Sequence, residues 1–229
     1  MDDALPVTEA TAAVQGGRRE RNKAERRRRI EAAARAVFAE KGYDAATTRE
    51  IAARAGIANG TLFLYAPDKV ELLMMIVNDE LVPLTEAGLA RLAPDRPLLA
   101  QLMAFFAMRY RFWARDPRLS RSLVRETFNL DATAEPAGPE TRRFLALRGR
   151  VHARIAEVVR AMQAAGRLRD DAAPERAARM LWALYLTEVH DWLSQRRPEV
   201  ADGLARLEGL LGIAVAGLAP RITKEEERG

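Results

Sequence analysis

The sequence contains no cysteine and only two histidines, His152 and His190. Without cysteine, the chain has no disulfide bonds, no thiolate metal sites and no thiol catalysis. No apolar run approaches the ~18–20 residues that span a bilayer, and the acidic, polar N-terminus does not resemble a secretory signal. We therefore expect a cytoplasmic protein with no membrane segment, no metal site and no cofactor.

Runs of Val, Ile and Thr that alternate with polar residues are also missing, while Ala, Leu, Arg and Glu dominate. The 229 residues are 48% hydrophobic, which is enough for a substantial core. The sequence predicts an all-α fold of about nine helices, with a break or kink at Pro83 and a loop over 131–139. The expected helices span about 23–41, two short segments within 47–66, a segment that starts after Asp68, and about 98–115, 119–129, 140–165, 174–196 and 200–219.

The excess positive charge is concentrated in one short run near the N-terminus. Residues 18–29 hold eight basic and two acidic side chains, a net charge of +6, against +5 for the whole chain. Clustered arginine and lysine attract phosphates regardless of base sequence. A solvated helix face or a disordered tail would have the same composition, and we expect residues 1 to about 20 to be largely disordered.

The segment that follows has the signals of two short helices joined by a glycine. Thr47 and Glu50 have the spacing of a capping box at the start of the first helix. Gly56 stands where a left-handed residue ends a helix, and a second helix is expected over about 59–65. Two such helices form a helix-turn-helix, which places its second helix in the major groove of DNA.

This segment resembles the DNA-binding unit of TetR-type transcriptional regulators. The resemblance covers the first third of the chain and is carried by Gly42, Tyr43, Thr47, Thr48, Ile51, Ala52, Ala55, Gly56, Ile57, Gly60, Thr61, Leu62, Tyr65, Lys69, Leu72 and Leu73. It implies a disordered basic arm over 1–22, a three-helix DNA-binding domain over 23–76, and a larger helical domain over 77–229 for effector binding and dimerisation. Ala58, Phe63 and Ala66 depart from residues that are common in the family.

Side-chain chemistry identifies the residues expected to contact DNA. Thr48 offers a hydroxyl near a helix N-terminus. Asn59 could pair with adenine, and Gly60 permits close backbone approach. The other candidates are Thr61 at the groove floor, Leu64 for an apolar base contact, and Tyr65 with Lys69, which resemble the family's phosphate clamp. Leu62 is assigned to the core.

Two further sites are expected in the larger domain. Met103, Phe106, Tyr110 and Trp113 share a helix face, and either line the effector pocket implied by the resemblance or fill a core. Apolar residues of the last two helices predict a subunit interface, with burial inside the monomer as the alternative. The candidates for that interface are Trp182, Tyr185, Leu204, Leu207, Leu211, Ala214 and Leu218.

The combined hypothesis is a homodimeric, sequence-specific regulator that binds palindromic double-stranded DNA and is released by a small apolar or amphipathic effector. A non-specific, nucleoid-type DNA-binding protein would share the basic run. An all-helical enzyme is a second alternative, although the sequence contains no phosphate-binding glycine loop, nucleophile elbow or metal-ligand cluster.

Overall fold

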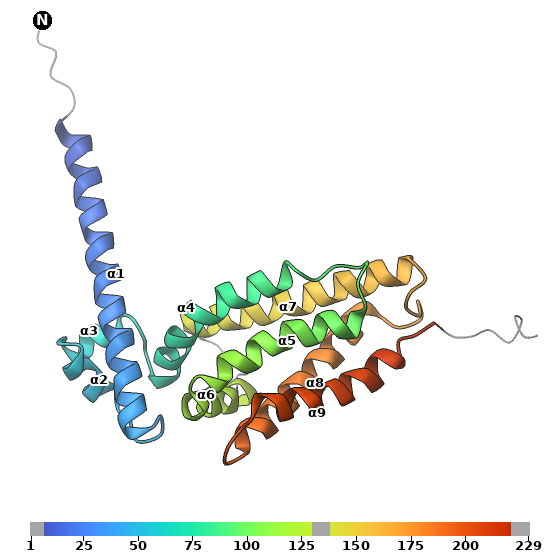
Figure 1. Cartoon of the computed structure of the whole chain (residues 1–229). Helices are drawn as coiled ribbons and strands as arrows, with labels where there is room; N and C mark the ends of the chain where they lie inside the picture. The colour runs from blue at the N-terminus through green and yellow to red at the C-terminus, as the bar shows by residue number, and fades with distance from the viewer. Residues whose placement is uncertain (1–6, 130–137, 221–229) are drawn as a thin grey trace, which may run out of the picture. The chain divides into compact units, whose positions relative to one another are not determined.

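All regular secondary structure in the described part of the chain is helical, which confirms the predicted fold class. The computed structural model describes residues 7–129 and 138–220, with side chains for 18–128 and 138–220. Most of the loop predicted over 131–139 therefore lies outside the described residues. The nine helices of these residues are α1 (Val7–Lys41), α2 (Thr48–Arg54), α3 (Asn59–Phe63), α4 (Lys69–Leu89), α5 (Leu98–Ala114), α6 (Pro117–Asn129), α7 (Pro139–Ala164), α8 (Pro174–Ser194) and α9 (Val200–Ala216) (Figure 1).

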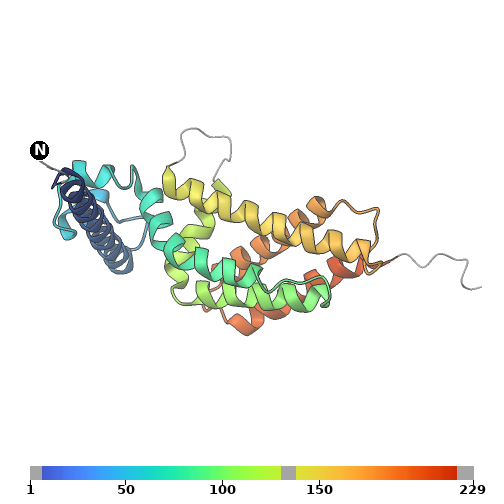
Figure 2. The same ribbon diagram turned by 90° about the horizontal axis from the view of Figure 1, so that it is seen from above.

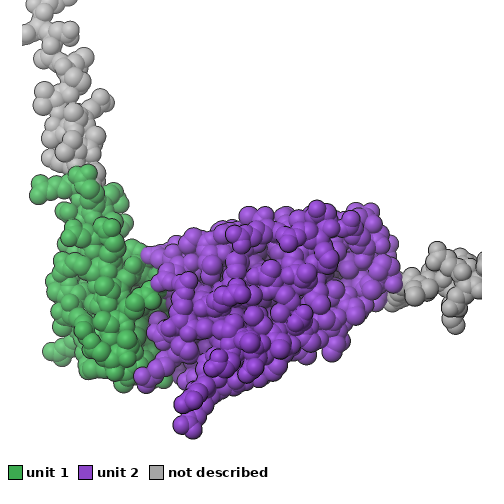
Figure 3. All heavy atoms as spheres, in the orientation of Figure 1, with its two compact units in different colours: residues 1–76 green, residues 77–229 purple. Residues whose placement is uncertain are grey.

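The chain divides into two compact units, coloured separately in Figure 3. Unit 1 ends at Ile76 and unit 2 begins at Val77, so the boundary falls within α4. No helix of the described residues is sufficiently long and apolar to cross a membrane.

Unit 1 is built on an apolar stripe of α1. Ile30, Ala34 and Phe38 lie on that stripe at helical spacing and are at most 4% exposed. The ring of Phe38 packs 5.4 Å from that of Tyr43. Gly42, with φ +80°, ends α1 in the left-handed conformation that glycine adopts without strain.

The start of α1 differs from the sequence prediction. The helix begins at Val7, although disorder was expected up to about residue 22 and the helix only from about residue 23. Gly16 and Gly17 lie inside this helix and do not end it. Each glycine costs a helix only about 1 kcal/mol relative to alanine, and the surrounding alanines and charged residues favour helix.

Helix α4 starts at a side-chain cap and contains a proline in its interior. Asp68 caps its start, because the backbone N–H of Glu71 donates to Asp68 Oδ1 at 2.8 Å. The break expected at Pro83 does not occur, because α4 continues through it to Leu89, whereas the kink expected there stays a prediction. A proline removes one backbone hydrogen bond, and the burial of Leu81 and Thr85 on either side stabilises the helix across that position.

Unit 2 is a bundle in which α7 packs on α8, and α9 packs on both α5 and α8 (Figures 1 and 2). Its centre is aromatic: the ring of Phe106 stacks on Tyr185 with centroids 4.4 Å apart, and Tyr110 lies 4.9 Å from Trp192. Gly203 lets α9 approach this cluster closely, since a Cβ there would lie 2.5 Å from Tyr110 Cε1.

Candidate DNA interface and ligand cavity

The first helix of the predicted motif has the capping box expected at its start. The backbone N–H of Glu50 donates to Thr47 Oγ1 at 3.3 Å, and the Thr47 backbone N–H donates to Glu50 Oε2 at 3.1 Å. Lys41 also donates to the Glu50 carboxylate. The hydrogen bonds from Lys41 and then from Thr47 lower the pKa of Glu50, so the box stays intact at neutral pH.

A glycine turn ends α2 and redirects the chain. Gly56 has φ +64°, its N–H donates to the carbonyl of Ala53, and the N–H of Ile57 donates to Ala52, both at 3.1 Å. These are the two hydrogen bonds of a Schellman turn. The guanidinium of Arg29 donates to the carbonyl of Ala55 at the same turn. A cation placed at a helix C-terminus also suits the helix dipole.

The second helix of the motif, α3, presents most of its first turn to solvent. Asn59 and Gly60 are exposed, Thr61 is half-buried, and Leu64 just beyond the helix is 85% exposed. Leu62 is fully buried, as predicted, and holds the helix on the unit 1 core. The side chains expected to read bases are therefore accessible, and the one assigned to the core is not.

Two departures from the family pattern have visible consequences at α3. Ala58 occupies the N-cap and makes no side-chain capping bond, so the backbone N–H groups of the first turn depend on other partners. Phe63 is 43% exposed. Its ring adds apolar surface beside Leu64, where a tyrosine would add a hydroxyl.

The predicted phosphate clamp is partly engaged within unit 1. Lys69 Nζ donates to the carbonyls of Asp44 at 3.0 Å and Ala46 at 3.3 Å, and lies 4.6 Å from the centroid of the Tyr43 ring. An ammonium group has three N–H donors, so one remains for a phosphate. Tyr65 is half-buried.

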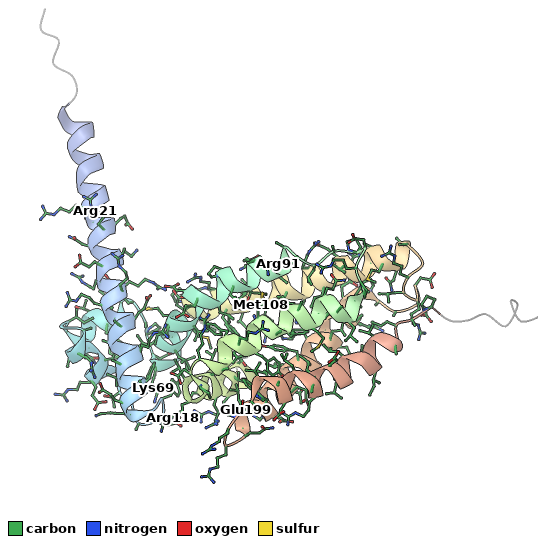
Figure 4. All side chains as sticks on the ribbon, viewed as in Figure 1. Arg21, Lys69, Arg91, Met108, Arg118 and Glu199 are labelled. Atoms are coloured by element: carbon green, nitrogen blue, oxygen red, sulfur yellow. The ribbon has the colours of Figure 1, made fainter. Side chains whose placement is uncertain are left out.

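The basic run lies along α1 and is largely exposed. Of its eight basic side chains only Arg27 is half-buried, and it pairs with Glu31 at 2.9 Å. Arg21, labelled in Figure 4, projects outward from the helix. These exposed cations on α1, which packs on α2, give unit 1 a surface suited to polyanions.

Unit 2 contains a small cavity of about 20 Å³, room for roughly one water, so side chains nearly fill it in this conformation. The lining residues are Arg109, Trp113, Val124, Thr127, Phe144, Arg148, Trp182, Tyr185, Leu186 and Val189.

Of the four predicted pocket residues, Trp113 alone lines this cavity. Phe106 and Tyr110 are fully buried in the aromatic core, and Met103 is half-buried elsewhere. Helical spacing identified a shared face, but that face points partly at α9 and not only at the cavity. The alternative of a filled core therefore applies to Phe106 and Tyr110.

The polar residues of the cavity were not predicted from the sequence. Arg109 is 3% exposed; its Nη1 donates to Thr85 Oγ1 at 2.7 Å and its Nε to the Tyr185 hydroxyl at 3.0 Å. Trp113 Nε1 donates to the same hydroxyl at 2.7 Å. The signal that could have found them is an arginine three residues after Phe106 on an otherwise apolar helix face.

The predicted dimer interface consists mostly of side chains that are covered within one chain. Five of its seven residues are buried there and offer little surface to a partner: Trp182, Tyr185, Leu207, Leu211 and Leu218. Leu204 and Ala214 are half-buried. These apolar stripes are covered by α5 and by the contact of α8 with α9. Met180 on α8 and Ile213 on α9 are the exposed large apolar residues of these two helices, at 40% and 74% exposure.

The histidines do not form a metal site, and no cluster of potential metal ligands occurs within residues 7–129 and 138–220. His190 is exposed and lies 3.2 Å from the Asp191 carboxylate. The buried Nε2 of His152 has no hydrogen-bond partner among the described residues. Burial, followed by the charges of Arg148 and Arg179, lowers the pKa of His152.

A helix-turn-helix beside a basic helix, on a chain with a second helical unit, defines a DNA-binding transcriptional regulator. Residues 30–74 match the family model described as bacterial regulatory proteins, tetR family. The HTH-type transcriptional repressor KstR of Rhodococcus jostii (strain RHA1) is 32% identical over 184 residues, which are 80% of this chain and 80% of KstR. The chain belongs to the TetR family of transcriptional regulators.

Solved structures of repressors have the same fold. Thermus thermophilus FadR, a TetR-family repressor in complex with lauroyl-CoA, superposes with a TM-score of 0.66 at 28% identity, over 86% of this chain and 97% of FadR. SmeT, the repressor of the Stenotrophomonas maltophilia efflux pump SmeDEF, gives a TM-score of 0.60 at 25% identity, over 84% of this chain and 90% of SmeT.

Proposed function

We propose that this chain is a homodimeric repressor that binds a palindromic operator and leaves it when a small amphipathic molecule enters unit 2. Residues 23–76 would read the DNA, with basic residues of 1–22 as an additional arm, and residues 77–229 would bind the effector and dimerise. The observation that carries this proposal is the outward presentation of Asn59, Gly60 and Leu64 beside the exposed basic run. A repressor of this kind would act in the cytoplasm.

Base reading would come from the first turn of α3 and its neighbours. An asparagine amide can donate to and accept from the adenine edge, and an exposed Leu64 suits a thymine methyl group. Thr48, Tyr65 and the free N–H of Lys69 would meet phosphates and fix the register. A Cβ at Gly60 would have no atom of the described chain within 4 Å, so DNA backbone could approach this residue closely.

Selection of binding sites from random duplexes tests sequence-specific binding. The proposed repressor enriches an inverted repeat whose half-sites lie about one helical turn apart. Competition with unrelated DNA at ~150–200 mM salt then separates it from a nucleoid-type protein, because phosphate attraction alone weakens steeply with salt. Enrichment of no sequence would refute the proposal.

The revised dimer surface is the outward stripe of α8 and α9. Met180, Ala183 and Thr187 are exposed on α8, as are Gly209 and Ile213 on α9. A Cβ at Gly209 would contact nothing within 4 Å in the described part of the chain, so the surface has room for another helix at close range. A four-helix interface between two copies would bury this stripe.

A charge placed on this stripe tests the dimer. Ile213→Asp should yield a monomer by sedimentation velocity, since an aspartate would be buried without a partner at the interface. Glu208→Asp, on an exposed position of the same helix, serves as the control and should remain dimeric. A dimeric Ile213→Asp protein would rule out this surface.

The effector role is supported by the cavity and by the relatives. Lauroyl-CoA is the ligand of the Thermus FadR structure, which has the same fold at 28% identity. Because side chains nearly fill the cavity, a ligand must move them, and α4 continues from unit 1 into unit 2. The coupling energy between ligand and operator would be ~1–3 kcal/mol. A ligand that binds tightly yet leaves operator affinity unchanged refutes this mechanism.

A further inference from the structure

The cavity of unit 2 combines an apolar wall with buried positive charge. Val124, Phe144, Leu186 and Val189 provide aliphatic and aromatic surface. Arg109 and Arg148 are the only charged residues of the described chain that line it, and no carboxylate is among them. An apolar wall with convergent cations suits a ligand that has an apolar body and an anionic end.

Arg109 is a buried cation without a counter-anion. It forms no ion pair with any described residue, and its hydrogen bonds to Thr85 and Tyr185 use two of its five N–H donors. The rings of Trp113, Trp182 and Tyr185 lie 5.1–5.6 Å from its guanidinium carbon and offset part of the desolvation cost. A guanidinium group keeps its charge in proteins. The rest of its desolvation cost is therefore offset only when an anion binds beside it.

Other hydrogen-bond donors of the cavity also suit an anionic ligand. Trp182 lines the cavity, and its buried Nε1 has no hydrogen-bond partner in the described part of the chain. The Tyr185 hydroxyl oxygen already accepts two hydrogen bonds, which leaves its proton to donate. Arg148, half-exposed on α7, also forms no ion pair among the described residues, and its charge contributes to the lowered pKa of His152. The cavity is thus rich in hydrogen-bond donors that an anionic ligand would satisfy.

We infer, resting on the effector response proposed above, that this cavity selects an amphipathic anion whose oxygen atoms are held by Arg109 and Arg148. The apolar body lies against Val124, Phe144 and Val189. The anionic oxygens belong to a carboxylate or to the phosphates of a coenzyme A thioester, and both present charged oxygen acceptors to the two guanidinium groups. A neutral molecule of the same shape leaves Arg109 unpaired and binds more weakly.

Tryptophan fluorescence provides the binding assay. Trp113 and Trp182 line the cavity, and Trp192 is the third tryptophan of the chain. The probes are laurate, lauroyl-CoA and methyl laurate, which keeps the chain of laurate but removes its charge. Laurate, lauroyl-CoA or both should bind at least tenfold more tightly than methyl laurate, and the arm that does so identifies the head group. Equal affinity for methyl laurate, or no binding of either anion, overturns the inference.

Variants that remove one positive charge test which arginine is responsible for the preference for anions. Arg109→Met should weaken anion binding by roughly ten- to a hundredfold, the value of a hydrogen-bonded charge, and should spare methyl laurate. Arg111→Met is the matched control, because Arg111 is an exposed arginine of the same helix. If Arg109→Met does not fold, Arg148→Met supplies the same comparison at a half-exposed position. A variant that weakens laurate and methyl laurate equally assigns the arginine a structural role and overturns the inference.

Operator release is measured separately from ligand binding. If methyl laurate releases DNA as well as laurate does, the effector role stands and the anion preference is wrong. If laurate binds by its charge and the operator stays bound, the anion preference stands and the effector role is wrong.

Discussion

Replacing Gly56 with alanine should destabilise unit 1 more than any other glycine-to-alanine change in the helix-turn-helix. Gly56 has φ +64°, a conformation that costs an L-residue with a side chain about 1–2 kcal/mol. A Cβ there would also lie 2.9 Å from Arg29 Nη2. The guanidinium would have to move from the carbonyl of Ala55, at a cost of about 0.5–1.5 kcal/mol.

An effect on the unfolded state offsets part of this loss in folding free energy. Alanine has less backbone freedom than glycine, which favours folding by about 0.4–1 kcal/mol. The expected net change in the free energy of unfolding of unit 1 is therefore a decrease of about 0.5–3 kcal/mol. Gly60→Ala is the matched control: Gly60 is helical, and no atom of the described chain would lie within 4 Å of its Cβ. Alanine should stabilise that position by up to about 1 kcal/mol.

Urea unfolding followed by two signals measures the difference. All three tryptophans lie in unit 2, whereas far-UV circular dichroism reports the helices of both units. Gly56→Ala should lower the urea midpoint of the dichroism signal and leave the fluorescence midpoint nearly unchanged. Gly60→Ala should keep full stability but bind operator less tightly, since its methyl group would stand between α3 and the DNA. A Gly56→Ala protein as stable as the parent would refute the role assigned to this turn.

Three more changes probe the same unit and its neighbour. Thr47→Ala should cost about 1 kcal/mol in urea unfolding by removing the capping box, while Thr48→Ala should not alter stability. Lys69→Met should lower stability by about 1–2 kcal/mol, because its hydrogen bonds to two carbonyls are lost. It should also reduce the slope of log operator affinity against log salt concentration by about one unit. An unchanged slope excludes the phosphate contact. His152 has a pKa below its ordinary 6.5, chiefly through burial, so the unfolded chain takes up the proton first as pH falls. Stability should therefore decrease below pH ~6.5, and urea midpoints of His152→Phe should lose that decrease.

Local signals explain why the helix-turn-helix could be predicted from the sequence. The capping box needs only Thr47 and Glu50 at a fixed spacing, and the turn needs only a glycine after Ala55. These interactions close within a few residues, so tertiary context cannot easily alter them. The structure has both in the predicted places.

The sites of unit 2 depend on contacts between distant segments, and sequence patterns predicted them less well. An apolar stripe on a helix requires burial, but the pattern does not identify what covers it. Leu207 and Leu211 are covered by their own chain, while Ile213 remains exposed. Likewise, Arg109 carries the same charge as the exposed Arg111, and only the packing of α4, α5 and α8 distinguishes them.

The claim that α3 reads the base edges of DNA is tested most directly by the base preference of α3 variants. Operators that differ by single base pairs are titrated with the parent protein, Asn59→Ala and Thr61→Ala, alongside an unrelated duplex. If α3 reads base edges, each variant loses about 1–3 kcal/mol of discrimination at one or two base pairs and keeps its affinity for unrelated DNA. Equal loss on every duplex, or no loss on any, would contradict the placement of α3 against the bases.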